Sequence, residues 1–279
     1  PTISWATLVG MGYADGPGTF SQVIRVRVDD GDGGITESTA VDLTVDNAPP
    51  TADAGGPYTI TEGQSLALNG SGSDPAGAAD TLTYSWDIND DDVFDDVVGA
   101  SPLLTWNDLV GFGISDGTGA TYTLTLRVSD EDGGFTESSV LLTVDNAAPT
   151  ADAGGPYAIT EGQSLALSGS GSDPAGAADP LSYSWDINGD GTFGDALGAA
   201  PIVPWATLAS LNIDGNGTPY NVKVRVSDDD GGFTDSVAVT LTATNPPPPA
   251  AARGPFTVPE SQAPPLSCNL SIRPPRSAG

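Results

Sequence analysis

The chain repeats itself with a period of 99 residues, and this repetition limits its possible folds more than any other feature of the sequence. The segment ADAGGPY at residues 52–58 returns at residues 151–157, and TEGQSLAL at residues 61–68 returns unchanged at residues 160–167. A fixed period of this length is typical of an array of small domains that each form their own core.

The repetition divides the chain into half a unit, two whole units and a tail. The first 47 residues match the second half of the unit, because the segment around Trp5 pairs with the segment around Trp106. The units meet at short Asn-Ala-Pro stretches, where proline stops strand pairing. The tail starts with four prolines, does not match the repeat and is expected to be disordered. The predicted domains are a half repeat at 1–47, whole repeats at 48–146 and 147–245, and the tail at 246–279.

Within each unit, apolar and polar residues alternate in short runs. The runs at residues 82–88, 122–128 and 140–144 have the period of a half-buried strand, and no segment sustains a helical period. A unit of about 100 residues with short strands and turn signals predicts an antiparallel β-sandwich of immunoglobulin type. Trp86 and Trp185 are expected in the core of this sandwich. The fold class predicted for the whole chain is therefore all-β, as tandem immunoglobulin-like sandwiches.

The composition is strongly acidic, with 37 acidic against 8 basic residues and a formal net charge of −29. Such a surface repels nucleic-acid phosphates and anionic membranes, so neither is an expected partner. No apolar run reaches the length of a membrane span, so no membrane insertion is expected within this segment. The acidity either keeps the protein soluble or attracts cations.

The sequence offers little for catalysis. It contains no histidine, which excludes Ser-His-Asp chemistry and histidine-based metal sites, and Cys268 is its only cysteine. The acidic segments that could form a paired-carboxylate site recur in each whole unit, which favours a structural device over one active site. We therefore expect no catalytic residues and no enzymatic activity in this segment.

Residues 183–192 (YSWDINGDGT) resemble the PKD (polycystic kidney disease) domain family, whose hallmark is a Trp-Asp-Phe-Gly-Asp-Gly motif. Residues 171–174 and 226–232 and the joints between units add to the resemblance. The chain departs from the family by one extra residue within the motif, and the middle repeat has WDINDDD at residues 86–92 instead. The resemblance implies a PKD-type sandwich. It also implies a secreted or cell-surface location, because the family occurs as spacer, adhesion or carbohydrate-associated modules of large extracellular proteins.

The motif of the second whole repeat has the spacing of a calcium loop. Asp186, Asn188 and Asp190 occupy positions 1, 3 and 5, and a glycine follows at position 6, as in the first half of an EF-hand loop. The backbone carbonyl of Thr192 is the next expected ligand, and Asp195 can close the site. The alternative is a turn rich in Asp and Asn whose carboxylates face solvent.

The middle repeat offers a similar set of candidate ligands. Asp87, Asn89 and Asp91 have the same spacing, with Asp95 and Asp96 nearby as further candidate ligands. Asp92 replaces the glycine, so the bend costs more. Calcium is the predicted cofactor of both loops, with the same acidic turn as the alternative.

A second kind of acidic cluster recurs late in each unit, always before Gly-Gly. One interpretation is a hairpin turn with solvated acids. The other joins these turns to Asp46 or Asp145 at the joint between units, as a calcium-stiffened linker, since adjacent acids repel one another and a divalent cation neutralises them. The clusters are Asp29, Asp30 and Asp32; Asp130, Glu131 and Asp132; and Asp228, Asp229 and Asp230.

These observations predict an extracellular structural or adhesive stalk of calcium-stiffened repeats. The expected partner is a cell-surface or matrix protein or a polysaccharide. The alternative is an accessory carbohydrate- or protein-binding module of a larger secreted hydrolase, and a third possibility is a passive spacer without a ligand. For the second role, candidate exposed platforms for sugars are Trp5, Trp106 and Trp205, because each precedes a loop.

Overall fold

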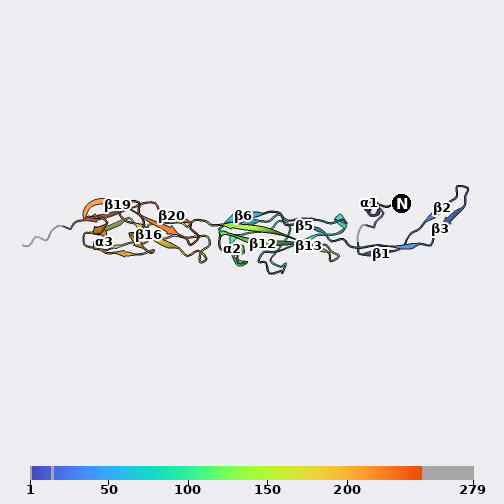
Figure 1. Ribbon diagram of the computed structural model, residues 1–279, viewed down its shortest axis with the longest axis horizontal. Coiled ribbons are helices and arrows are strands. Elements are labelled where there is room, and N and C mark those ends of the chain that lie inside the picture. The colour runs from blue at the N-terminus through green and yellow to red at the C-terminus, as the bar shows by residue number, and fades with distance from the viewer. Residues whose placement is uncertain (1, 14–15, 247–279) are drawn as a thin grey trace, which may run out of the picture.

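The computed structural model describes residues 2–13 and 16–246 of the chain. The units follow one another along a single long axis, with the N-terminal half repeat at one end and the second whole repeat at the other (Figure 1). Almost the whole tail predicted at 246–279 lies outside the described residues.

The first whole repeat is a sandwich of one five-stranded sheet and two short strand pairs. The large sheet has the order β10-β9-β12-β13-β6, in which only β6 runs parallel to its neighbour β13. Its strands are β6 (Tyr58–Thr61), β9 (Thr83–Asp87), β10 (Val97–Val98), β12 (Thr118–Ser129) and β13 (Phe135–Asp145). The short pairs are β5 (Thr51–Asp53) with β8 (Ser71–Ser73), and β7 (Leu66–Ala67) with β11 (Leu103–Leu104).

The second whole repeat has the same plan. Its large sheet has the order β14-β21-β19-β16-β17, and β20 extends the pairing of β19. The strands are β14 (Tyr157–Thr160), β16 (Ser182–Asp186), β17 (Ala196–Leu197), β19 (Asn216–Ser227), β20 (Phe233–Asp235) and β21 (Val239–Thr244). A short pair, β15 (Leu165–Ala166) with β18 (Ile202–Val203), lies outside this sheet.

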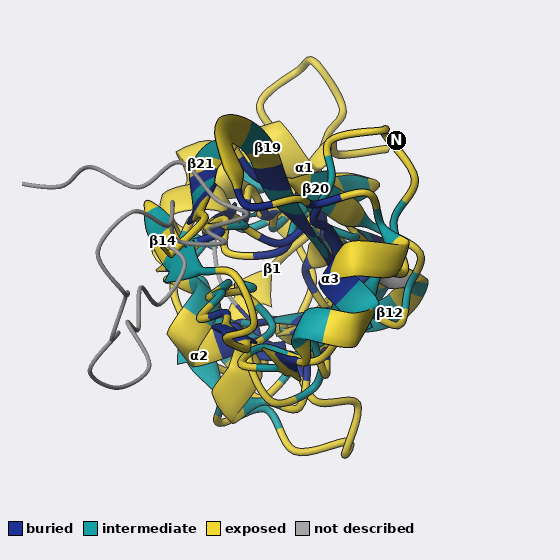
Figure 2. Ribbon diagram, turned by 90° about the vertical axis from the view of Figure 1, so that its left-hand side faces the viewer, coloured by how far each residue is buried: buried dark blue, intermediate teal, exposed yellow. Residues whose placement is uncertain are grey.

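Each whole repeat has its own hydrophobic core around a tryptophan. Trp86 and Trp185 are fully buried, and the indole N–H of each donates to a backbone carbonyl, that of Gly99 at 3.0 Å and that of Gly198 at 2.9 Å. The alternating residues Leu124, Leu126 and Val128 of β12 are also completely buried. The view along the molecule shows buried segments inside and exposed loops around them (Figure 2). The all-β prediction of tandem immunoglobulin-like sandwiches is therefore confirmed.

The half repeat forms two antiparallel strand pairs, one of which lies in the chain between the two strands of the other. β1 (Gly18–Ile24) pairs with β4 (Val41–Val45), and β2 (Arg27–Asp29) pairs with β3 (Ile35–Glu37). Most side chains in these strands are exposed. A half unit contributes one layer of the sandwich, so its apolar residues have no second layer to cover them.

Three short helices were not predicted from the sequence. They are α1 (Trp5–Gly10), α2 (Trp106–Gly111) and α3 (Trp205–Ser210), and each begins at the repeated tryptophan. Six residues are too few to show a helical period, but the start of α2 has a local signal. Thr105 and Asp108 form a capping box, in which each side chain bonds the backbone N–H of the other. None of the helices in the described part of the chain has the length and apolar character needed to cross a bilayer.

Candidate functional site

The predicted calcium loop of the second whole repeat connects β16 to β17. The backbone N–H groups of Gly189 and Gly191 donate to the two carboxylate oxygens of the buried Asp186, at 2.8 and 3.0 Å. Asp195 accepts from the N–H of Ile187 at 2.8 Å, which draws the two ends of the loop together. Asp186 and Asp195 therefore hold the shape of the loop.

The other two candidate side chains of this loop bond to each other and to the backbone. The amide of Asn188 donates to Asp190 at 3.1 Å, and the N–H of Thr192 donates to Asp190 at 2.7 Å. The bond from the N–H of Thr192 is the main cause that lowers the pKa of Asp190. Asp190 is exposed.

The middle repeat builds the corresponding loop in the same way. Asp87 accepts from the N–H groups of Asp91 and Asp92 at 3.2 and 2.9 Å, and Asp96 accepts from Ile88 and Asn89 at 2.7 and 3.2 Å. The backbone of Asp92 has a φ of 64°, in the left-handed region that its counterpart Gly191 adopts without a side-chain penalty. In both loops the backbone amides use carboxylate oxygens that a cation would need, and calcium binding there stays a prediction.

The late acidic turns lie at the joints between units. In the two whole repeats the first acid holds the turn together: Asp130 accepts from the N–H of Gly134 at 2.7 Å, and Asp228 accepts from that of Gly232 at 2.7 Å. The same two acids also accept from the joint asparagines, Asp130 from Asn47 at 3.0 Å and Asp228 from Asn146 at 3.1 Å. Burial opposes ionisation of Asp130, but these hydrogen bonds outweigh burial and lower its pKa.

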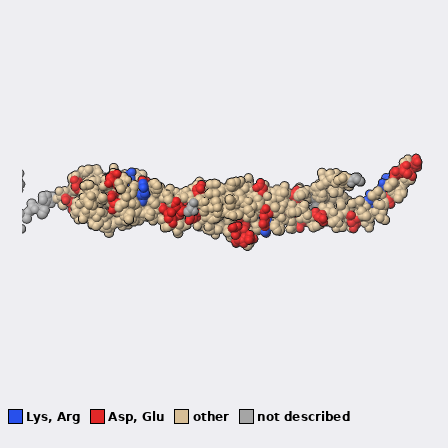
Figure 3. All heavy atoms as spheres, in the orientation of Figure 1, with Lys and Arg blue, Asp and Glu red and all other residues tan. Residues whose placement is uncertain are grey.

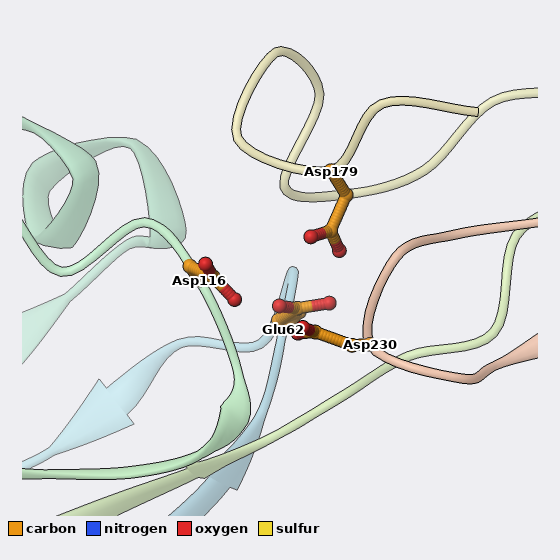
Figure 4. Close-up of side chains that lie close together, drawn as sticks. All are labelled: Glu62, Asp116, Asp179 and Asp230. Atoms are coloured by element: carbon orange, nitrogen blue, oxygen red, sulfur yellow. The ribbon is translucent and has the colours of Figure 1, made fainter.

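The joint between the two whole repeats brings four carboxylates together (Figure 4). The first whole repeat contributes two of them, one from the turn after β6 and one from the loop between α2 and β12. The second whole repeat contributes one just before β16 and one from the late turn between β19 and β20. Each residue contributes one carboxylate oxygen, and these four oxygens all lie within 4.8 Å of one another. The residues are Glu62, Asp116, Asp179 and Asp230.

Two of these carboxylates are almost completely removed from solvent. Glu62 is 3% and Asp179 is 1% exposed. Neither oxygen of Asp179 has a hydrogen-bond partner, and one oxygen each of Glu62, Asp116 and Asp230 is also buried without one. The ion pairs found among the described residues all lie elsewhere. Buried charges without partners are strongly unfavourable, so these carboxylates favour protonation or a neutralising cation.

Burial and mutual repulsion raise the pKa values of three of the four carboxylates. Burial, followed by repulsion from Glu62 and other neighbouring carboxylates, raises the pKa of Asp179 to about 7. Burial and the facing carboxyl of Asp116 raise the pKa of Asp230 to about 6. Burial also raises the pKa of Glu62, although the N–H of Ala147 donates to it at 3.1 Å.

Direct contacts also connect the two whole repeats at this joint. The indole N–H of the half-buried Trp106 donates to the backbone carbonyl of Pro174 in the next repeat at 3.0 Å. Trp5 makes the same bond to Pro75 at the preceding joint, at 2.8 Å. Trp106 is therefore a joint residue and not an open platform for sugars. Trp205, at the far end of the second whole repeat, lines a shallow pocket with Glu161 and Asp214.

A family model described as the PKD domain matches residues 47–111 and 146–243, which is more than half of the chain. The chain belongs to the PKD domain family. This confirms the resemblance found in the motif at residues 183–192.

Among curated proteins, these PKD repeats are similar to a protein named Chitinase A from Pseudoalteromonas piscicida. The two are 30% identical over 151 residues, which cover 51% of this chain but only 16% of the chitinase. Solved structures with similar folds include the insect immune protein hemolin (12% identity, TM-score 0.41, 79% of this chain and 55% of hemolin). Another is the fibronectin(III)-like modules of Clostridium thermocellum CbhA (11% identity, TM-score 0.28, 70% of this chain and 95% of the modules).

Of the four carboxylates in the joint, the sequence analysis singled out only Asp230, as part of a late acidic turn. Glu62, Asp116 and Asp179 were missed because each stands alone in its segment, without the clustered spacing of a metal loop. A usable signal was present: Glu62 and Asp179 recur at the 99-residue period as Glu161 and Asp80. Repeated single acids in the end loops of a tandem unit indicate a role where units meet.

Proposed function

We propose that this chain is an extracellular stalk segment, in which tandem PKD repeats hold the flanking parts of a larger protein apart and bound calcium stiffens the array. The observation that supports it most is the joint between whole repeats. The hydrogen bonds from Trp106 to Pro174 and from Ala147 to Glu62 both connect residues of the two whole repeats at this joint. Such contacts restrict the angle between neighbouring repeats, whereas a flexible spacer would lack them.

Several further observations support a role without catalysis. The chain contains no histidine, and its acidic side chains are distributed along the whole visible length of the molecule (Figure 3). The candidate acids recur from repeat to repeat. The proposed partner at the ends of the stalk is a cell-surface or matrix protein or a polysaccharide.

The test of the stalk is the distribution of distances between the two whole repeats. Val98 and Leu197 are equivalent, 74% and 72% exposed, and suited to spin labels after Val98→Cys and Leu197→Cys in a Cys268→Ser background. If the chain is a stalk, pulsed electron–electron double resonance should give one narrow distribution of distances between the two spin labels. A broad distribution in calcium and in chelator alike would show freely jointed repeats and contradict the proposal.

The second candidate function is an accessory module of a secreted polysaccharide-degrading enzyme. The similarity to a protein named Chitinase A favours it. Co-sedimentation of the full chain with insoluble chitin, and with cellulose for comparison, tests this role. Retention on chitin that soluble chito-oligosaccharides abolish would support it, and recovery of all protein in the supernatant would argue against it.

A further inference from the structure

The four carboxylates at the joint form an electrostatic arrangement that a cation completes. One oxygen of each lies within 4.8 Å of the others, which is no more than about twice a Ca²⁺–oxygen distance of roughly 2.4 Å, so these separations suit four ligands of a single ion. In Figure 4 the side chains from the two repeats point toward one another across the joint.

Asp179 is the independent observation that indicates a ligand. An acidic cluster on a surface needs no explanation, because water solvates each carboxylate. Asp179 is 1% exposed, both of its oxygens lack a hydrogen-bond partner, and it faces three other acids. Native proteins rarely leave both oxygens of a buried carboxylate without a partner, and a bound metal ion is a recognised reason for such a group.

Two further oxygens near this joint are buried without a partner. One belongs to Asp173, whose charge raises the pKa of both Glu62 and Asp179. The other is the side-chain oxygen of Asn146, whose amide nitrogen donates to Asp228. Ca²⁺ takes six to eight oxygen ligands, and these two atoms are the side-chain candidates to supplement the four carboxylates.

We propose that a calcium ion binds at this joint, held by Glu62 and Asp116 of one repeat and by Asp179 and Asp230 of the next, and that it locks the two repeats together. The proposal rests on the stalk function and names the site that stiffens the stalk. Because the ligands come from both repeats, the ion binds well only when the repeats are docked, and binding therefore favours the docked arrangement.

The far end of the second whole repeat provides a matched comparison. Glu161 is the counterpart of Glu62 within the same TEGQSLAL sequence, yet Glu161 is exposed and Glu62 is buried. Glu161 and Asp214 line the pocket at this end with no Asp179 or Asp230 counterpart among the described residues that face them. A substitution at Glu161 therefore removes the same charge without removing a ligand of the joint.

The experiment measures thermal unfolding and calcium titration of the full chain in chelator and in Ca²⁺. With a dissociation constant of about 10⁻⁴–10⁻³ M, as in other extracellular modules, about 10 mM Ca²⁺ should raise the Tm by roughly 3–11 °C. Asp179→Asn should remove this rise and one calorimetric binding event. In chelator, the same variant should melt no lower than the parent, because it removes one buried charge from a repelling group.

Three variants make the outcome decisive. Glu62→Gln should behave like Asp179→Asn, while Glu161→Gln and the loop variant Asp190→Asn should keep the calcium response. A response that survives in Asp179→Asn and Glu62→Gln, or that disappears in Asp190→Asn, would overturn the joint site. A narrow distance distribution between repeats without any calcium response would also overturn it, yet would leave the stalk function standing.

Discussion

Arg225 shows how single side chains stabilise the outer face of a PKD repeat. Its guanidinium lies 4.4 Å from the ring centre of Phe193 and 4.3 Å from that of Phe233, and it donates to Asp235 at 2.6 and 3.0 Å. Arg127 occupies the same position between Phe94 and Phe135 in the first whole repeat. In a chain with only 8 basic residues, this repeated use of arginine joins three segments of one sheet face.

The pair predicts a pH dependence of stability. The hydrogen bond from Arg225 lowers the pKa of Asp235, so the pair stabilises the fold above the unfolded-state pKa of about 3.9. This contribution is lost as the pH falls through the lower folded-state pKa. Because the pair is about one-third exposed, Asp235→Asn should cost only about 0.5 kcal/mol near neutral pH.

Urea unfolding of the parent and of Asp235→Asn across an acid pH series measures this difference. The two free energies of unfolding should converge at the acid end of the series, where Asp235 is protonated. A difference that stays constant throughout would mean that Asp235 acts through packing and not through its charge.

At the scale of elements, the short helix at the end of each unit positions the joint. The capping box of Thr105 and Asp108 starts α2 at Trp106, and the buried Leu109 fixes the helix to the core. This directs the indole N–H of Trp106 toward Pro174 in the next repeat. The hydrogen bonds of Asp108 with Thr105 also lower the pKa of Asp108, as expected for a charged capping residue.

Trp106→Phe tests this coupling, with Trp205→Phe as the matched control. Both substitutions keep a ring against the helix and core, but of these two tryptophans only Trp106 is seen to donate to another repeat in the described part of the chain. Trp106→Phe should therefore cost an additional ~0.5–1.5 kcal/mol in unfolding free energy and broaden the distance distribution between the repeats. Equal effects of the two substitutions would show that the bond to Pro174 does not couple the repeats.

At the scale of the whole molecule, charge repulsion opposes the folded state. The net charge is −29, and the ion pairs found in the described residues are exposed and few. Screening by monovalent salt therefore weakens far more repulsion than attraction.

Sodium chloride should accordingly stabilise the chain, which is the opposite of what salt does to a fold held by surface ion pairs. Between about 0.02 M and 0.5 M salt in chelator, the Tm should rise on the order of 2–4 °C, which corresponds to about 1 kcal/mol. Differential scanning calorimetry measures the shift. A Tm that falls with salt would mean that the few ion pairs contribute more than the repulsion.

The fold of each unit is predictable from the amino-acid pattern alone. Leu124, Leu126 and Val128 alternate along a strand and are buried within one unit, as are Trp86 and its counterpart Trp185. Because these contacts lie within one unit, the apolar–polar period of the sequence predicts them. The motif around Asp186 likewise predicted a tight acidic loop, whose shape the structure shows in its hydrogen bonds. The family followed from the same motif.

The contacts between units are visible only in the folded structure. Glu62 and Glu161 stand in identical segments, but one is buried beside three other acids and the other is exposed. Local sequence cannot distinguish them, because Glu62 is buried at the joint, where it lies beside Asp179 and Asp230 of the next repeat. The apolar–polar pattern of a unit determines which residues face its own core. The docking of neighbouring units determines which end loops become buried.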